Sequence, residues 1–188
     1  SAYIVPVVKD GENKFNGAGY SIAYSVDELD PKKVAKEGVE DALEKIGGKS
    51  IPTGKYKAII NNEAMVSLLS TFSGIFNAEA AQRGLSLLKG KEGEMIASDV
   101  VTIIDDPHLD KGLASTPFDD EGVATYKKEV VSNGRLSTLL YNLKTAYKAG
   151  KKSTGNGFKA SYSGSLGTDA TNFYLQKGSK SLEKLMEE

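Results

Sequence analysis

The alternation of apolar and polar residues is most regular in the middle of the chain, between Phe118 and Asn156. Side chains alternate over 123–130 and again over 136–142, and Asn133-Gly134 stands between the two runs. A period of two is typical of strands, and Asn-Gly supplies the positive φ angles that a tight type I′ turn needs. The pattern therefore predicts a β-hairpin. Because an isolated hairpin is marginally stable, we expect the rest of the chain to cover it.

Two helices are predicted where apolar residues recur at every third or fourth position. The first covers 30–48, where Asp30 is a suitable N-cap and Pro31 suits the first helical position. The second starts at Asn61-Asn62 and carries an apolar stripe over 65–76. Because the second helix is the more apolar, we expect it to be buried in a core or an interface.

Short apolar or β-branched runs predict further strands, at 3–8, 17–26, 55–60, 100–104 and 172–176. We expect the first of them to be buried and to form a hairpin with the second. Strands joined by hairpins and mixed with helices are typical of α+β proteins. The sequence therefore predicts an α+β fold, with a largely antiparallel β-sheet and two main helices packed on it, in a single domain over 1–188.

The composition suits a globular domain and counts against several classes of function. The chain has 188 residues, is 39% hydrophobic and carries a formal net charge of −1, so it can bury a sizeable core and lacks the basic surface of a nucleic-acid-binding protein. It contains no cysteine, which excludes disulfides and thiolate ligands within it. No apolar run approaches the roughly 20 residues of a membrane helix. We expect no direct contact with nucleic acid or membrane.

Two polar segments that flank the hairpin are candidate binding sites. The first is an acidic triplet, Asp119, Asp120 and Glu121. It could hold a hard cation, or its carboxylates could accept hydrogen bonds from loop amides in a turn. The second places short polar side chains among glycines, at Ser153, Thr154 and Asn156. It could bind a peptide backbone or a partner, or form a tight loop.

The single histidine and a small basic cluster carry weaker signals. His108 lies in a loop among acidic residues, a setting more typical of a hydrogen-bonded surface group than of a metal ligand. The basic cluster consists of Lys148, Lys151 and Lys152. Three lysines in a nearly neutral chain are more typical of a solvated face than of a DNA contact.

A series of segments resembles the TldD/PmbA family, peptidases formerly described as modulators of DNA gyrase. The similarity extends in order over about 29–156, and its last part falls on the predicted hairpin and the segments beside it. The matching segments are Ile51-Pro52-Thr53-Gly54-Lys55-Tyr56, Asp105-Asp106-Pro107-His108-Leu109, Gly112-Leu113, Phe118 to Thr125, Asn133-Gly134, Tyr141-Asn142 and Ser153-Thr154-Gly155-Asn156. The resemblance implies relatives longer than this chain, so we expect the chain to be the central to C-terminal part of a longer protein.

The segment from Asn62 to Ser67 separates the two branches of that family. In the TldD branch, as the resemblance implies, this place holds His-Glu-x-x-x-His, which binds zinc and uses the glutamate as general base. Here Glu63 remains, but Asn62 and Ser67 replace the histidines, and both are poor zinc ligands. Positions five apart also lie about 140° apart on an ideal helix. The resemblance is therefore closer to the PmbA branch, also called TldE.

We interpret Glu63 as a first-turn helix glutamate that the helix dipole favours, with a part in catalysis as the alternative. What the resemblance implies is a cytoplasmic, non-catalytic subunit that assembles with a TldD-type zinc peptidase, or with itself, to cleave small or unfolded peptides. We expect no metal or other cofactor in this chain and zinc in the partner. The alternatives are a metallopeptidase active in its own right and a regulator linked to DNA gyrase.

Overall fold

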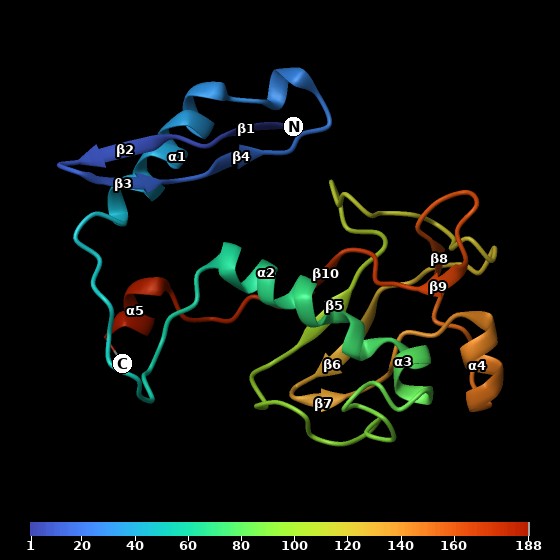
Figure 1. Ribbon diagram of the computed structural model, residues 1–188. Coiled ribbons are helices and arrows are strands. Elements are labelled where there is room, and N and C mark those ends of the chain that lie inside the picture. The colour runs from blue at the N-terminus through green and yellow to red at the C-terminus, as the bar shows by residue number, and fades with distance from the viewer. Residues whose placement is uncertain (188) are drawn as a thin grey trace. The chain divides into compact units, whose positions relative to one another are not determined.

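The computed structural model describes residues 1–187. Its backbone contacts group the chain into two compact units, Ser1–Lys57 and Ala58–Glu188. Both units combine helices with small antiparallel sheets (Figure 1). The predicted α+β class is therefore confirmed, whereas the single domain over 1–188 stays a prediction.

The first unit is built on a long hairpin. Its strands are β1 (Ala2–Ile4), β2 (Val7–Asp10), β3 (Asn13–Asn16) and β4 (Gly19–Ser21). β1 pairs with β4 and β2 pairs with β3, both antiparallel, and Gly11 at the tip has a φ of +61°. The predicted hairpin is confirmed. The predicted burial of 3–8 is wrong, because this run divides into β1 and β2 and leaves Tyr3 82% exposed.

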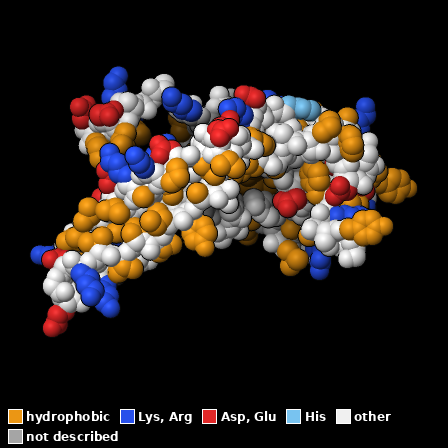
Figure 2. All heavy atoms as spheres, turned by 90° about the horizontal axis from the view of Figure 1, so that it is seen from above, with side chains coloured by type: hydrophobic (Ala, Val, Ile, Leu, Met, Phe, Trp, Pro, Cys, Tyr) orange, Lys and Arg blue, Asp and Glu red, His pale blue; other side chains and the backbone are white. Residues whose placement is uncertain are grey.

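Helix α1 (Pro31–Glu44) covers one face of this hairpin, after a short 3₁₀ turn η1 (Val26–Glu28). Asp30 caps α1 as predicted, because its Oδ1 accepts hydrogen bonds from the backbone N–H groups of Lys32 and Lys33. Other hydrophobic side chains of this unit remain exposed, among them Val7, Tyr20, Ile22 and Tyr24. Figure 2 shows hydrophobic side chains, in orange, gathered in patches on the face of the molecule that is in view.

The second unit contains a four-stranded antiparallel sheet in the order β10-β5-β6-β7. Its strands are β5 (Ile103–Asp105), β6 (Lys128–Ser132), β7 (Arg135–Leu136) and β10 (Phe173–Leu175). The hairpin β6–β7 turns at Asn133 and Gly134, whose φ angles are 46° and 78°. The predicted central hairpin is therefore confirmed, with shorter strands. A separate pair, β8 (Gly157–Lys159) with β9 (Leu166–Thr168), is also antiparallel.

The core of the second unit lies between this sheet and the short helices that follow α2 (Asn62–Phe72). These elements are η2 (Ser73–Phe76), α3 (Ala78–Gln82) and α4 (Leu143–Ala149), and a further short helix is α5 (Leu182–Met186). Buried apolar residues from β6, β7 and the segment after it meet Phe76 and Ala81 there. Among the described helices, none combines the length and the apolar composition of a transmembrane span.

One predicted strand is absent, and the core alternative for α2 is wrong. Residues 55–60 form no strand, because no neighbouring segment pairs with them. Helix α2 contains no buried residue, although Leu69 is half-buried against the core. The apolar stripe over 65–76 ends at Phe76, which is the residue where the buried core begins. That α2 is buried in an interface stays a prediction. The two main helices pack on different sheets, α1 on the hairpin of the first unit and α2 against β10.

Candidate functional site

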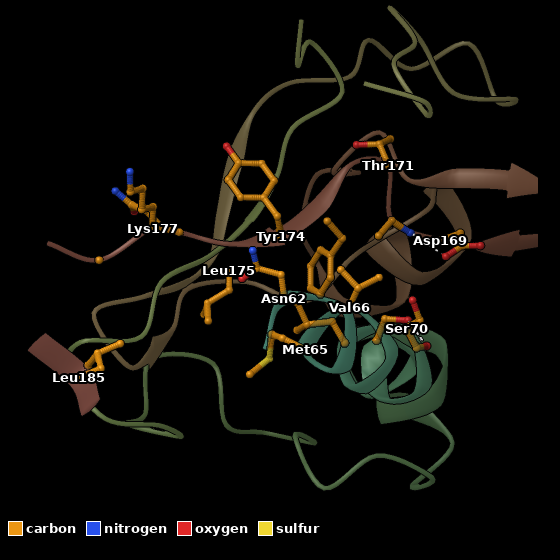
Figure 3. Close-up of a pocket in the computed structure, with 16 residues that line it drawn as sticks. Asn62, Met65, Val66, Ser70, Asp169, Thr171, Tyr174, Leu175, Lys177 and Leu185 are labelled. Atoms are coloured by element: carbon orange, nitrogen blue, oxygen red, sulfur yellow. Dashed lines mark hydrogen bonds between the residues drawn. The ribbon is translucent and has the colours of Figure 1, made fainter. Parts of the chain in front are cut away.

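A groove of about 940 Å³ runs between α2 and β10 in the second unit (Figure 3). The helix contributes one side of it, and β10 with the residues before and after it contributes the other. Leu185 of α5 also lines it. Most of the groove is apolar or uncharged, and its charged lining residues are Asp169 and Lys177.

The groove side of α2 follows from its sequence. Asn61 caps the helix, because its Oδ1 accepts a hydrogen bond of 2.8 Å from the Ala64 N–H. The lining residues of α2 then recur at spacings of three and four, so they occupy a single face of the helix. They are Asn62, Met65, Val66, Leu69 and Ser70, and Ser73, the first residue of η2, continues the row. This face is apolar in its middle and polar toward both ends of the helix.

The three positions of the degenerate zinc motif do not converge. α2 is a continuous helix from Asn62 to Phe72, so Asn62 and Ser67 stand about 140° apart around its axis. Asn62 lines the groove, whereas Glu63 and Ser67 do not. All three residues are exposed. Asn62 and Ser67 therefore point to different sides of α2 and do not converge on one metal ion.

The donor set also does not fit zinc. Within residues 1–187, no three His, Cys, Asp or Glu side chains are grouped so that they could hold a metal. His108 is held elsewhere: its backbone N–H donates to Asp106 Oδ1 at 3.1 Å, and its Nε2 lies 3.1 Å from the carbonyl oxygen of Thr125. This arrangement matches the predicted hydrogen-bonded histidine.

The acidic triplet accepts hydrogen bonds from backbone amides. Asp119 is buried and accepts from the N–H groups of Glu121, Val123 and Gly157 at 2.9–3.0 Å. Asp120 accepts from Lys159 N–H, and Glu121 accepts from Leu143 N–H, both at 2.7 Å. These carboxylates therefore join the loop to β8 and to α4. Their predicted role in binding stays a prediction.

The polar segment after α4 is also tied into the fold. Thr154 and Asn156 are buried, and Thr154 Oγ1 donates to Asn156 Oδ1 at 2.7 Å. Ser153 Oγ donates to the carbonyl oxygen of Tyr141 at 3.0 Å. The tight-loop interpretation accounts for these contacts, and a role of the segment in binding stays a prediction.

A buried charged network was missed at the sequence level. Asp105, at the end of β5, is fully buried and receives Lys128 Nζ at 2.9 Å and Asn156 Nδ2 at 2.8 Å on its Oδ2. Its Oδ1 accepts from the backbone N–H and the hydroxyl of Thr171. In the sequence, Asp105 follows a β-branched run and Lys128 lies in a run of alternating apolar and polar residues. Neither feature indicates that these two residues pair.

The basic cluster is partly neutralised. Lys151 Nζ lies 2.5 Å from Glu92 Oε2, and the hydroxyl of Tyr141 donates to the same carboxylate at 2.8 Å. Burial opposes ionisation of Glu92, but these hydrogen bonds and one from Leu139 N–H outweigh it and lower its pKa. Burial and the contact with Glu92 raise the pKa of Tyr141. Lys151 thus joins the loop that carries Glu92 to the segment after α4.

Comparison with known proteins places this geometry in a family. Residues 53–188 match the family profile described as "PmbA/TldA metallopeptidase C-terminal domain". The chain belongs to the PmbA/TldD family. A relative named Metalloprotease PmbA, from Escherichia coli O157:H7, is 33% identical over 138 residues, which are 73% of this chain and 31% of the relative.

Two solved structures share the fold of this PmbA/TldD chain. A proposed modulator of a DNA gyrase from Thermotoga maritima is 42% identical with a TM-score of 0.90, over 98% of this chain and 41% of its own. TldE from Thermococcus kodakarensis is 27% identical with a TM-score of 0.77, over 98% of this chain and 42% of its own. The chain thus spans about two fifths of the length of these relatives.

Proposed function

We propose that this chain belongs to a PmbA/TldE-like subunit that works with a TldD-type zinc peptidase and does not itself hydrolyse the peptide bond. The observation that carries this proposal is the helix α2. It carries Asn62 and Ser67 at the two positions where, as the resemblance implies, the TldD branch has histidines. In this proposal the subunit shapes the peptide-binding chamber, and the zinc belongs to the partner.

The same proposal covers the location and the partners of the subunit. We place it in the cytoplasm, in a homo- or hetero-oligomer whose substrates are small or unfolded peptides. The formal net charge of −1 and a pI of about 6.0 support a role without direct contact to nucleic acid. The acidic triplet and the segment of Ser153, Thr154 and Asn156 would act by keeping the chamber wall in shape.

The test is the zinc content of the complete protein, purified alone without chelator, together with peptide hydrolysis in the presence and absence of a TldD-type partner. We expect no stoichiometric zinc and hydrolysis that depends on the partner. One zinc per chain, with hydrolysis by the protein alone, would overturn the proposal.

A second candidate function is peptidase activity of its own. Two observations favour it: a relative carries the name Metalloprotease PmbA, and Glu63 remains in the first turn of α2. In this reading, ligands from outside residues 1–187 would hold the metal and Glu63 would be the base. Zinc-dependent hydrolysis without any partner is the result that distinguishes it.

A further inference from the structure

We propose that the groove between α2 and β10 binds an extended peptide segment, which adds to the free edge of β10 as an antiparallel strand. This inference rests on the proposed function, because it gives the subunit a defined place at which to hold a peptide. It differs from the zinc question, since it concerns the main chain of β10 and the face of α2 that carries Val66.

The hydrogen-bonding pattern of β10 leaves one edge open. β10 is the outermost strand and pairs with β5 alone. On that side, Asp106 N–H donates to Asn172 O at 3.0 Å and Gln176 N–H donates to Thr102 O at 2.8 Å. Antiparallel ladders use alternate residues for one neighbour, so the backbone groups of Phe173 and Leu175 point to the other side.

No hydrogen bond joins these outward groups of Phe173 and Leu175 to another residue in the described part of the chain. A row of alternating donors and acceptors is the template on which another strand can pair. An extended main chain satisfies such a row in register, whereas a compact ligand does not. The free edge therefore indicates what kind of ligand the groove would take.

The groove offers an apolar wall beside this edge (Figure 3). Met65 and Val66 of α2 line it, and Val66 is 59% exposed. A volume of about 940 Å³ lies within the usual range of roughly 300–1,000 Å³ for ligand sites. Side chains of an added strand that point toward α2 would bury Met65 and Val66, so apolar residues at alternate positions are favoured.

The charges at the two ends of the groove define the preferred sequence of an antiparallel segment. Lys177 and Asp169 lie toward opposite ends (Figure 3) and are the charged residues of its lining. Lys177 forms no ion pair with the described residues, and the Asp169 carboxylate accepts from the adjacent Ala170 N–H. An antiparallel segment passes Lys177 first and Asp169 last. It would therefore carry an acidic residue near its start and a basic residue near its end.

The first test measures fluorescence anisotropy of two labelled peptides with the complete protein alone. The matched peptide is acetyl-Glu-Val-Thr-Val-Thr-Val-Lys-amide, and the control exchanges its Glu and Lys. We expect the matched peptide to bind about threefold tighter or more, the effect of two exposed ion pairs. Lys177→Glu should remove this preference, and Lys148→Glu, an equal charge change on α4, should leave it intact. Equal binding of both peptides would overturn the charge pairing, and tighter binding of the exchanged peptide would overturn the antiparallel direction.

The second test addresses the main-chain pairing. N-methyl groups are placed either on the three valine amides or on the two threonine amides of the matched peptide. Strand addition uses one of these two sets and leaves the other in solvent, so one set should abolish binding and the other should not. Binding that survives both modifications, or is lost equally with both, would overturn strand addition.

The third test locates the peptide on α2. Val66→Glu puts a charge into the groove and should weaken binding at least about tenfold. Leu68→Glu is the matched control, because Leu68 is 42% exposed on the same helix and does not line the groove. Equal losses in the two variants, or none in either, would place the peptide elsewhere.

Hydrogen exchange distinguishes a free edge from an occupied one. In the protein alone the amides of Phe173 and Leu175 should exchange fast, and the matched peptide should slow them. Slow exchange without peptide would mean that another part of the complete protein already covers β10, which would overturn the proposal. All these measurements are made without the zinc partner. A negative result in them refutes the peptide-binding proposal, whereas hydrolysis by this protein alone would refute the proposed function.

Discussion

At the residue scale, the second unit depends on the carboxylate of Asp105. Its desolvated charge is balanced by Lys128 and by hydrogen bonds from Asn156 and Thr171. A buried ion pair of this kind adds little net stability, but removing one donor leaves the buried charge less well compensated. The network links β5, β6 and the segments before β8 and β10. It therefore fixes how these segments join.

Asn156→Ala tests this network. Asn156 is fully buried and donates to both Asp105 and the carbonyl oxygen of Asp169 at 2.8 Å. Its loss should lower the free energy of unfolding by about 3 kcal/mol, because a buried charge loses a donor. Asn62→Ala, at an exposed position of α2, should change it by less than about 0.5 kcal/mol. Urea unfolding gives both values, and a cost for Asn156→Ala as small as that of the control would contradict the argument.

A pH effect is expected at Glu92. Its pKa in the folded state lies below the usual value of 4.5, because hydrogen bonds from Lys151, Leu139 and Tyr141 outweigh the effect of burial. A lowered folded-state pKa stabilises the protein above the unfolded pKa, and this contribution is lost as pH falls through the folded value.

Glu92→Gln should therefore flatten the loss of thermal stability below pH 4.5. The readout is the melting temperature at a series of pH values between neutrality and the acid limb. Glu94→Gln, at an exposed position in the same loop, is the control and should follow the wild-type curve. If Glu92→Gln also follows the wild-type curve, the hydrogen bonds to Glu92 do not cause the fall in melting temperature at acid pH.

At the scale of elements, the first unit is held by close backbone contact between α1 and the hairpin. A Cβ atom added at Gly17 would collide with the carbonyl oxygen of Gly38 and lie 2.5 Å from Ala42 N. Gly17→Ala should thus destabilise the first unit by about 2 kcal/mol or more. Gly74→Ala is the control, because its Cβ would meet open space. Calorimetry should show a lower transition temperature for Gly17→Ala and an unchanged transition temperature for Gly74→Ala. An unchanged transition temperature in both variants would contradict this packing.

Elements with local signals could be predicted from the sequence. Asp30 and Pro31 mark the start of α1, and Asn133-Gly134 marks the turn of the β6–β7 hairpin, because caps and positive φ angles depend on a few adjacent residues. Burial could not be predicted in the same way. The run over 3–8 is apolar enough for a core, yet its exposure depends on which elements cover it, and 55–60 forms no strand because it has no partner.

The site was predictable to a similar extent. The replacement of histidines by Asn62 and Ser67 is visible in the sequence, and so is the helical spacing that separates them. The sequence does not reveal that the Asn62 face of α2 lies along β10, nor that Asp105 meets Lys128. Both facts depend on contacts between residues far apart in the chain, and single-sequence patterns carry no information about such pairs.

At the scale of the whole molecule, Glu63→Gln tests whether the chain takes part in the chemistry. Glu63 is exposed in the first turn of α2 and does not line the groove. Glutamine keeps the shape of the side chain but cannot accept a proton as a general base. If the subunit is non-catalytic, peptide hydrolysis by the assembly of this protein with a TldD-type partner should stay within about twofold of the wild-type rate.

The matched control for Glu63→Gln is the same substitution at the motif glutamate of the TldD-type partner. Removal of a general base typically lowers the rate by roughly 10²–10⁴-fold, so that variant should be nearly inactive. A loss of this size from Glu63→Gln would instead assign a proton-transfer role to this subunit. Because Glu63 does not line the groove, such a result would also require a different arrangement of α2 in the working assembly, and the groove along β10 would then no longer describe its peptide-binding face.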